Sequence, residues 1–307
     1  MARTATTGTA RPPAPRDLRS DPARTALVTG ATTGIGLEVT RRLAATGWHV
    51  LLHARDDADG RRAVDRLVRG GADPRRVELV VADFARLAAV RDLAGAVAAR
   101  PHRLDLLVNN AAVRGAARRA ETVDGNELSW QVNYLAHYLL TRSLLPAFSP
   151  GGGSRVVNLS SSLHRMGNLA WDDLNRTGRY APVAVYAQAK LALTMFGVAL
   201  ARHADPGLTA VNVHPGVVRT GLMTIYGRSG APVVDGALAV LRAATGDATP
   251  VNGGYYEGCL PAVPAPLVGD PAAVERLWQL SARMVGLEVR SPADMAVPSE
   301  PSRSHLG

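Results

Sequence analysis

The sequence predicts an α/β fold in which a parallel sheet carries helices on both faces. Short apolar runs alternate with longer helical patterns over residues 25–213, and this alternation is typical of βαβ units. A glycine-rich loop follows the first apolar run and opens the first helix. The chain has neither a coiled-coil heptad nor an internal repeat with a period of about 20–50 residues. Because parallel crossovers are right-handed, few topologies remain open.

The expected strands are short apolar runs that end in glycine or polar residues, which is the profile of buried parallel strands. They lie at residues 25–29, 48–53, 77–82, 104–108, 155–159 and 208–213, with a last strand at 253–256. The expected helices lie at residues 37–45, 61–69, 87–99, 125–146 and 182–203, followed by 230–245 and 271–285.

We expect one folded domain over residues 24–288. The chain of 307 residues is long for one domain, but α/β folds of this size often form one. The strand and helix pattern loosens around 221–266, which we expect to act as a substrate lid. Residues 1–23 are rich in Arg, Thr, Ala and Pro, and we expect a disordered tail there. The polar residues 289–307 are expected to be a flexible tail.

Composition excludes several classes of protein. Hydrophobic residues make up 47% of the chain, enough for a sizeable core. No run reaches the roughly 18 uncharged apolar residues that a membrane span needs, and the start of the chain lacks the apolar segment of a secretory signal. Cys259 is the only cysteine, which excludes an internal disulfide and fits a reducing compartment. We therefore expect a cytoplasmic protein without a membrane span.

The formal net charge of +9 raises the question of nucleic-acid binding. The arginines are scattered in short clusters, and no aromatic residues stand between them. We interpret the charge as a solvated basic surface and expect no nucleic-acid partner. Such a field gives a modest advantage to a site for a phosphorylated cofactor.

The glycine loop predicts a nucleotide site. Residues 29–36 read TGATTGIG, between an expected strand and an expected helix. A helix N-terminus presents unpaired N–H groups and a partial positive charge, which suit a pyrophosphate. Glycines allow close approach of the backbone to phosphates and of the helix to the strand. The spacing is GxxxGxG, not the more common GxGxxG, and an ordinary glycine-rich turn is the alternative.

The end of the second strand favours NADP over NAD. An acidic residue that binds the ribose 2′-hydroxyl is expected there in NAD-binding proteins, but Ala54 occupies that place and Arg55 follows. Arginine suits a bidentate contact with a phosphate. Asp56 weakens the argument, because after a small shift it could reach the ribose.

Tyr186 and Lys190 are the candidate proton-handling pair. They are four residues apart in an expected helix, so they share one face of it. The reference pKa of tyrosine is about 10, and a neighbouring ammonium lowers it. Such a tyrosine can act as an acid in one direction and a base in the other. The spacing alone is a weak signal, but Lys190 is the only lysine in a chain whose other cationic side chains are arginine and histidine.

Small or polar residues follow the ends of separate expected strands. Ser160-Ser161-Ser162 follows one strand, and Asp83, Asn109-Asn110 and Pro215-Gly216 follow others. Ligands of parallel sheets bind outside the carboxyl ends of the strands. A serine hydroxyl there could stabilise oxyanion charge on a substrate carbonyl, although any one serine can also be a helix cap.

On these residues the chain resembles the short-chain dehydrogenase/reductase family, over about residues 26–220. The motifs that carry the resemblance are TGxxxGxG at 29–36, NNAG as Asn109-Asn110-Ala111-Ala112, the helix asparagine Asn133, Ser161 within NLSSSLH, YxxxK at Tyr186 and Lys190, and the PG motif at 215–220. Alanine in the last place of NNAG departs from the family pattern, and Ser160 or Ser162 are alternatives to Ser161. HARD at 53–56, HPGVVRT at 214–220, LWQLS at 277–281 and the long gap between Ser161 and Tyr186 are similar to the branch of retinol dehydrogenases and WW-domain oxidoreductases.

The resemblance implies a single-domain Rossmann fold with about seven strands, and a homodimer or homotetramer. It implies that Tyr186 exchanges a proton, Lys190 lowers the tyrosine pKa and holds the nicotinamide ribose, Ser161 orients the carbonyl oxygen, and Asn133 positions a relay water. Asp83 and Phe84 would flank the adenine of NADP(H). The residues expected to bind the cofactor are Gly30, Thr32, Thr33, Gly34, Ile35, Gly36, Arg55, Asp83, Phe84, Asn110, Ala111, Tyr186, Lys190, Pro215, Gly216, Val218 and Thr220.

The expected function is hydride transfer between nicotinamide C4 and a carbonyl or alcohol of a lipophilic small molecule. The pocket wall is expected from 164–180, 222–234 and 255–266, and the candidate substrate contacts are His164, Met166, Met223, Tyr226 and Tyr255. These residue types are as often plain core. No metal is expected. The alternative function is a nucleotide-binding family member with a non-redox role, such as dehydration, cyclisation or isomerisation.

Overall fold

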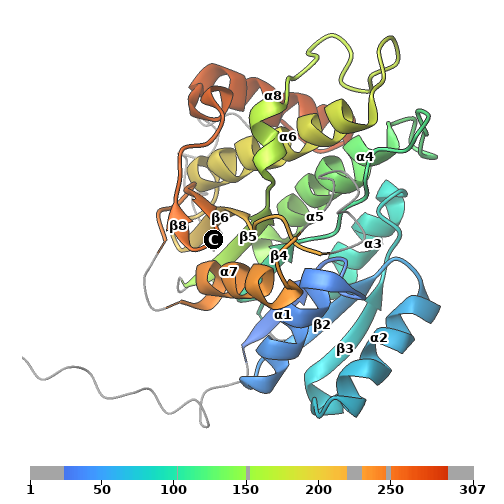
Figure 1. The fold of residues 1–307 in the computed structure, drawn as a ribbon, viewed down its shortest axis with the longest axis vertical. Helices are drawn as coiled ribbons and strands as arrows, with labels where there is room; N and C mark the ends of the chain where they lie inside the picture. Colours follow the sequence, from blue (N-terminus) through green and yellow to red (C-terminus); the bar gives the residue numbers. More distant parts are fainter. Residues whose placement is uncertain (1–23, 102, 150–152, 220–229, 247–249, 290–307) are drawn as a thin grey trace, which may run out of the picture.

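The computed structural model describes residues 24–101, 103–149, 153–219, 230–246 and 250–289. Its centre is an eight-stranded sheet with the order β3-β2-β1-β4-β5-β6-β7-β8 (Figure 1). The strands are β1 (Thr25–Val28), β2 (His49–Ala54), β3 (Val77–Val81), β4 (Leu106–Asn109), β5 (Ser154–Leu159), β6 (Leu208–His214), β7 (Tyr255–Glu257) and β8 (Leu260–Pro261). Strands β1 to β7 pair in parallel, and β8 pairs antiparallel to β7. The parallel α/β fold is therefore confirmed.

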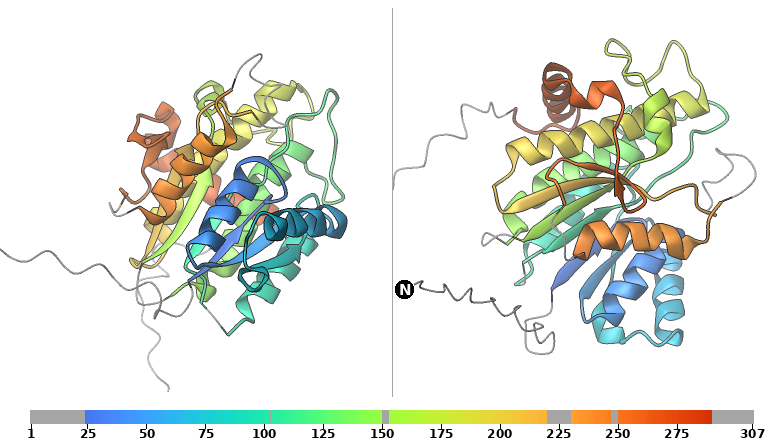
Figure 2. Two further views of the ribbon diagram at one scale, coloured as in Figure 1. Left: turned by 60° about the horizontal axis from the view of Figure 1, so that its bottom comes forward. Right: turned by 60° about the vertical axis from the view of Figure 1, so that its left-hand side comes forward.

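Helices cover both faces of this sheet (Figures 1 and 2). The helices are α1 (Gly34–Ala45), α2 (Asp57–Arg69), α3 (Leu87–Ala98), α4 (Leu128–Trp130), α5 (Ala136–Leu144), α6 (Pro182–His203), α7 (Val233–Thr245) and α8 (Pro271–Met284). Side chains of α1, α2 and α7 form one apolar cluster with the sheet, and those of α3, α5, α6 and α8 form the other. The core thus has two halves, one on each face.

The chain order changes direction between β1 and β4. From β1 the sheet proceeds outward through β2 and β3, and the chain then returns to the other side of β1 to form β4. At such a point the loops after the two strands diverge to opposite sides and leave a crevice at the carboxyl edge, where ligands of doubly wound sheets bind. The fold therefore locates a site beyond the ends of β1 and β4.

The helix expected at 125–146 is interrupted. Its first turn is α4, residues Gln131–Leu135 form a π-helical segment, and α5 and a 3₁₀ turn at Leu145–Ala147 complete it. The expected start at Gly125 is also too early, because Glu127 caps α4 by accepting a hydrogen bond from the Trp130 N–H. Hydrophobic periodicity does not distinguish one wide turn from regular helix, and such turns are frequent at functional sites.

Helix α8 covers the outer sides of α5 and α6. Trp278 stacks on His203 with ring centroids 4.4 Å apart and packs edge-on against Tyr138 at 5.4 Å. The Tyr134 hydroxyl bonds to Ser281 Oγ at 2.5 Å. The helix expected at 271–285 is therefore part of the main core.

Helix α6 is long and apolar enough to cross a membrane, but 83% of its most apolar window is buried within the protein. It lies against β5, β6 and α8, and its first half carries Tyr186 and Lys190. We interpret α6 as the central core helix.

The region expected to form a lid is only partly described. Helix α7 packs against α1 and the sheet, and a Cβ at Gly236 would lie 2.7 Å from Val218 and 3.1 Å from Ile35. It belongs to the helical layer. Residues 220–229 and 247–249 of the expected lid lie outside the described residues, as do the expected tail 1–23 and all but the first residue of the expected tail 289–307.

Candidate active site

A cavity of about 780 Å³ opens at the carboxyl edge of the sheet, beyond β1 and β4. This volume suits a cofactor together with a small substrate. The sequence-predicted residues that line the cavity are Gly30, Thr32, Thr33, Gly34, Ile35, Arg55, Asp83, Phe84, Asn110, Ala111, Ser161, Tyr186, Lys190, Pro215, Gly216 and Val218. Residues from six separate strand ends and from α6 therefore meet in one place.

The glycine loop forms the floor of one end of the cavity. Gly30 has a φ of 61°, and a Cβ there would lie 2.7 Å from the Ala111 Cα, so only glycine fits without a shift. Gly36 is similarly close-packed, since a Cβ would lie 2.6 Å from Asn110 Nδ2 and from the Gly30 carbonyl oxygen. Gly36 does not line the cavity but lets α1 approach the loop.

The N-terminus of α1 fits a pyrophosphate. Thr33 is the N-cap, but its side chain accepts no hydrogen bond from the helix, and the first turn holds no acidic residue. The Thr33 side chain therefore leaves the N–H groups of the first turn uncapped, beside a cavity wall formed by Thr32, Thr33, Gly34 and Ile35. Backbone donors and the helix dipole favour an anion at this place.

Asp56 is engaged in a hydrogen bond with the backbone of α2, whereas Arg55 is exposed at the cavity. Asp56 caps α2 by accepting the Asp59 N–H at Oδ1 (2.9 Å), which holds the pKa of the Asp56 carboxyl below its usual value. Arg55 lines the cavity, its side chain is 71% exposed, and its Nη2 lies 3.5 Å from Asp56 Oδ2. Asp59, which the sequence analysis missed, also lines the cavity and pairs with Arg62.

Asn110 holds the loop through its side chain. Its Nδ2 donates to the carbonyl oxygens of Thr29 (2.7 Å) and Gly30 (3.0 Å). The Thr29 hydroxyl accepts the N–H groups of Asn110 and Ala111, each at 2.9 Å. The ends of β1 and β4 are therefore locked together at the switch point.

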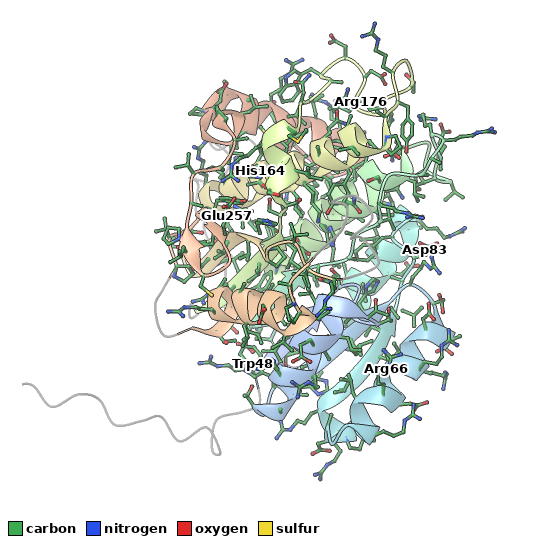
Figure 3. All side chains as sticks on the ribbon, in the orientation of Figure 1. Trp48, Arg66, Asp83, His164, Arg176 and Glu257 are labelled. Atoms are coloured by element: carbon green, nitrogen blue, oxygen red, sulfur yellow. The ribbon has the colours of Figure 1, made fainter. Side chains whose placement is uncertain are left out.

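The adenine end is bounded by Asp83 and Phe84, which follow β3. Asp83 Oδ1 accepts the Ala85 N–H at 3.0 Å, and Phe84 is 3% exposed. Figure 3 shows Asp83 on the α3 side of the molecule, away from His164 and Glu257. The lining residues extend from the end of β3 to the end of β6, so the cavity runs along the sheet edge, as an extended dinucleotide requires.

Tyr186 and Lys190 lie one turn apart on the first half of α6, and both line the cavity. Lys190 Nζ lies 5.8 Å from the centroid of the Tyr186 ring. It donates to the carbonyl oxygen of Leu159 at 2.7 Å, and the side chain is almost completely buried. Burial lowers the pKa of Lys190 to about 7, because desolvation disfavours the ammonium form.

The three serines after β5, Ser160 to Ser162, differ in their contacts. The Ser160 hydroxyl bonds to Thr194 Oγ1 on α6 at 2.7 Å. Ser161 is 2% exposed, lines the cavity, and caps the following 3₁₀ turn (Ser162–Met166) by accepting the Leu163 N–H at 3.2 Å. Ser162 is not part of the lining. This arrangement favours Ser161 over its neighbours as the serine that faces a substrate.

Asn133 lies in the π-helical segment and does not line the cavity. Its side chain receives the Val113 N–H at Oδ1 (2.7 Å) and donates from Nδ2 to the Val113 carbonyl oxygen (2.8 Å) and to Ser129 Oγ (2.9 Å). Its carbonyl oxygen lies 3.2 Å from His137 Nδ1. Through these bonds Asn133 supports the loop after β4, which itself lines the cavity.

Residues Pro215, Gly216 and Val218 line the cavity beyond the end of β6. Gly216 has a φ of 88°, a conformation that favours glycine. Val218 forms a parallel bridge with Ala231. Thr220, the last predicted cofactor residue, lies outside the described residues.

The predicted substrate contacts that the structure describes do not line the cavity. His164 is fully buried; its Nδ1 donates to the Ser161 carbonyl oxygen at 2.7 Å and its Nε2 accepts the Ala265 N–H at 2.9 Å. Tyr255 is 4% exposed and packs against the His164 ring, while Met166 is 73% exposed. None of the three lines the cavity. Both ring nitrogens of His164 are occupied, so its role is to hold the Ser161 turn. Met223 and Tyr226 lie outside the described residues.

Several lining residues were not predicted from the sequence. They are His53, Asp59, Ala82, Ala85, Ala112, Val113, Arg114, Leu128, Val132, Leu159 and His214, and Ser160, the alternative to Ser161, lines the cavity as well. Most follow or end strands, so the rule that ligands bind at strand ends could have found them. Leu128 and Val132 come from the α4 and π-helical region, and no sequence signal indicates that these two face the cavity.

The site belongs to the class of nicotinamide-dinucleotide oxidoreductases. It combines a parallel doubly wound sheet, a glycine loop before α1 and a Ser–Tyr–Lys set in one cavity.

Comparison with known proteins supports the same class. The short chain dehydrogenase family matches residues 24–228. Human retinol dehydrogenase 13 is 34% identical over 296 residues, covering 90% of this chain and 89% of that protein. Mouse polyprenol dehydrogenase is 36% identical over 303 residues, covering 91% and 88%.

Solved structures show the same relationship. A blue fluorescent protein from a metagenomic library, solved in complex with NADPH, has a TM-score of 0.61 and 28% identity, covering 77% of this chain and 97% of that one. The chain belongs to the short-chain dehydrogenase/reductase family, in its retinol dehydrogenase-like branch.

Proposed function

We propose that this protein is an NADP-dependent oxidoreductase that interconverts a carbonyl and an alcohol on a lipophilic small molecule. The observation that carries the proposal is the meeting of Ser161, Tyr186 and Lys190 with the glycine loop in one cavity. The nicotinamide of the bound dinucleotide supplies or accepts the hydride.

The protein's own residues handle the proton and the oxygen. The Tyr186 hydroxyl donates the proton to the substrate oxygen during reduction and takes it back during oxidation. Lys190, beside it on α6, stabilises the phenolate by its charge. The Ser161 hydroxyl hydrogen-bonds the substrate oxygen and orients it. Asn133 holds the loop after β4 in place and is our candidate for supporting the proton relay.

Arg55 supports the choice of NADP. It is exposed at the cavity wall, whereas the carboxylate of Asp56 is engaged at the cap of α2. Guanidinium geometry matches a phosphate, and an acid at this place would repel one. A relative in the solved structures was crystallised with NADPH.

The lipophilic substrate is proposed from the cavity and the relatives. Val113, Leu128 and Val132 give the cavity apolar side chains near the loop that Asn133 supports. The names of two relatives specify retinol and polyprenol as substrates. We extend only the shared chemistry, a primary alcohol or aldehyde on an apolar chain, to this protein.

The cellular location and the oligomeric state stay predictions. We expect a cytoplasmic location. We also expect a homodimer or homotetramer, and any such assembly has to use a surface other than the sides of α5 and α6 that α8 covers.

The experiment that tests the proposal follows NADPH absorbance while apolar aldehydes and ketones of graded chain length are added. Consumption of NADPH in step with alcohol formation supports the proposal. Conversion of a substrate with no change in NADPH supports the non-redox alternative instead.

A further inference from the structure

His53 occupies an unusual place at the carboxyl end of β2. The side chain is 2% exposed, and the residue forms part of the cavity wall. Its Nδ1 accepts the Gly30 N–H at 3.0 Å, and its carbonyl oxygen accepts the Ala31 N–H at 2.9 Å. One residue of β2 therefore holds Gly30 and Ala31, two successive residues of the turn after β1.

The ring also reaches the third strand. Nε2 lies 2.9 Å from the Ala82 carbonyl oxygen, which can only accept. The Gly30 N–H can only donate, so Nδ1 must be the unprotonated nitrogen and Nε2 must carry the proton. This neutral tautomer satisfies both partners at once, and burial, which lowers the pKa of His53 to about 4, keeps the ring neutral.

The face of the same ring packs against the adenine end of the cavity. His53 and Phe84 stack with centroids 4.4 Å apart. Three parts of the nucleotide site therefore depend on one side chain: the glycine loop, the end of β3 and Phe84. Arg55, our candidate for the 2′-phosphate, is two residues further along the chain.

We propose that His53 is a positioning residue for the dinucleotide, which sets the glycine loop against the wall formed by Ala82 and Phe84. The inference rests on the proposed function, because it concerns the same nucleotide site. His53 acts through the loop amides and through Phe84. Its loss therefore weakens dinucleotide binding and leaves the catalytic step at saturating cofactor intact.

Three substitutions separate the contacts. His53→Phe keeps an aromatic ring against Phe84 but leaves the buried Gly30 N–H without an acceptor. His53→Asn places an amide oxygen near the position of Nδ1 and keeps that acceptor. His53→Gln extends toward the Ala82 carbonyl and lacks an acceptor beside Gly30. The matched control is His49→Phe on the same strand, where the imidazole faces Glu78 at a more exposed position.

The test measures the dissociation constants of NADPH and NADH by direct binding, and KM and kcat separately. An unpaired buried donor costs enough for His53→Phe and His53→Gln to weaken both dinucleotides about tenfold or more. We expect kcat within about twofold of wild type, affinity largely restored in His53→Asn, and no change in His49→Phe.

Equal affinities for wild type and His53→Phe would overturn the inference and leave the proposed function standing. If His53→Phe fails to fold, the comparison of His53→Asn with His53→Gln decides, and equal affinity of those two variants overturns it as well. A wild type that binds neither NADPH nor NADH contradicts the proposed function itself, and the inference with it.

Discussion

Lys190 is a buried cationic residue within the proposed catalytic set. It is the only lysine of the chain, it is almost completely buried, and its Nζ donates to the Leu159 carbonyl oxygen. Desolvation favours its neutral form, so the apoprotein pays for an ammonium at this position. A lysine suits this position better than an arginine, because an arginine would hold its proton too tightly for this role.

The buried Lys190 ammonium makes the free energy of unfolding depend on pH. Burial lowers the pKa of Lys190 from 10.5 to about 7. Below pH 7 Lys190 is protonated in both the folded and the unfolded state, so the folded state is destabilised by the full cost of burying the ammonium. Between pH 7 and about 10.5 the unfolded state binds more protons, and the free energy of unfolding rises with pH.

Lys190→Met lacks this titration. We expect the cofactor-free variant to melt at a higher temperature than wild type at pH 6, and the difference to shrink as the pH rises to 9. Thermal unfolding of both proteins across this range measures it. No other lysine titrates in the window, because the chain has no other. A difference in melting temperature that stays constant with pH would contradict the assignment.

Arg55 is the residue that we expect to determine the preference for NADPH over NADH. Charge-assisted hydrogen bonds to a phosphate are worth enough that Arg55→Ala should lower kcat/KM for NADPH by roughly tenfold to a hundredfold. The value for NADH should change little. Arg69→Ala, an exposed arginine at the far end of α2, is the matched control. Preference of the wild type for NADH, or equal losses with both cofactors, would sink the proposed specificity.

Individual site residues were predictable where a local pattern fixes their place. Gly30 stands between a strand and a helix, and Tyr186 and Lys190 share a helix face and match the YxxxK motif; all three line the cavity. The structural role of His53 was not predictable in this way, and His164 was predicted to contact substrate but instead holds the Ser161 turn. His53 bonds to Gly30 and Ala82, and His164 bonds to Ala265, which are all distant from the histidine in sequence.

At the scale of elements, α8 is the helix that supports the catalytic helix from outside. Trp278 stacks on His203 of α6 and contacts Tyr138 of α5, and the Arg142 guanidinium lies 4.3 Å above its ring. The first half of α6 carries Tyr186 and Lys190, so α8 fixes the far end of the same helix.

Trp278→Ala should therefore destabilise the fold without altering the chemistry. Truncation of a buried tryptophan costs about 3–5 kcal/mol, measured as a loss in the free energy of unfolding by urea. At low temperature the folded variant should keep its kcat. Trp48→Ala, a half-buried tryptophan on the other face, should cost less. A loss for Trp278→Ala no larger than for Trp48→Ala would show that α8 does not support α6.

Most elements were predictable because their apolar patterns are local. Strand β6, expected at 208–213, spans Leu208–His214, and α6 has the predicted bounds Pro182–His203. Strand β8 and the π-helical segment were missed. A two-residue antiparallel strand has no pattern of its own, and the wide turn at 131–135 depends on the packing of Asn133 against the Val113 loop.

At the scale of the whole molecule, the order of the strands explains why these residues meet. The change of direction between β1 and β4 leaves the crevice, and parallel strands deliver their polar ends to the same edge. The helical layers, including α7 and α8, enclose the two core clusters and leave this edge open. The catalytic set and the nucleotide loop are therefore parts of one elongated cavity.

The central claim is that Tyr186 moves the proton while the dinucleotide moves the hydride. Tyr186→Phe removes one hydroxyl and leaves the ring in its place on α6, so NADPH should bind with wild-type affinity. Loss of a general acid lowers turnover by roughly 10²–10⁴-fold. The direct measurement is NADPH consumption by wild type and Tyr186→Phe at saturating cofactor and an apolar aldehyde, with cofactor binding measured in parallel. Normal binding with turnover reduced to that extent is the predicted result, and normal binding with near-wild-type turnover would contradict the account.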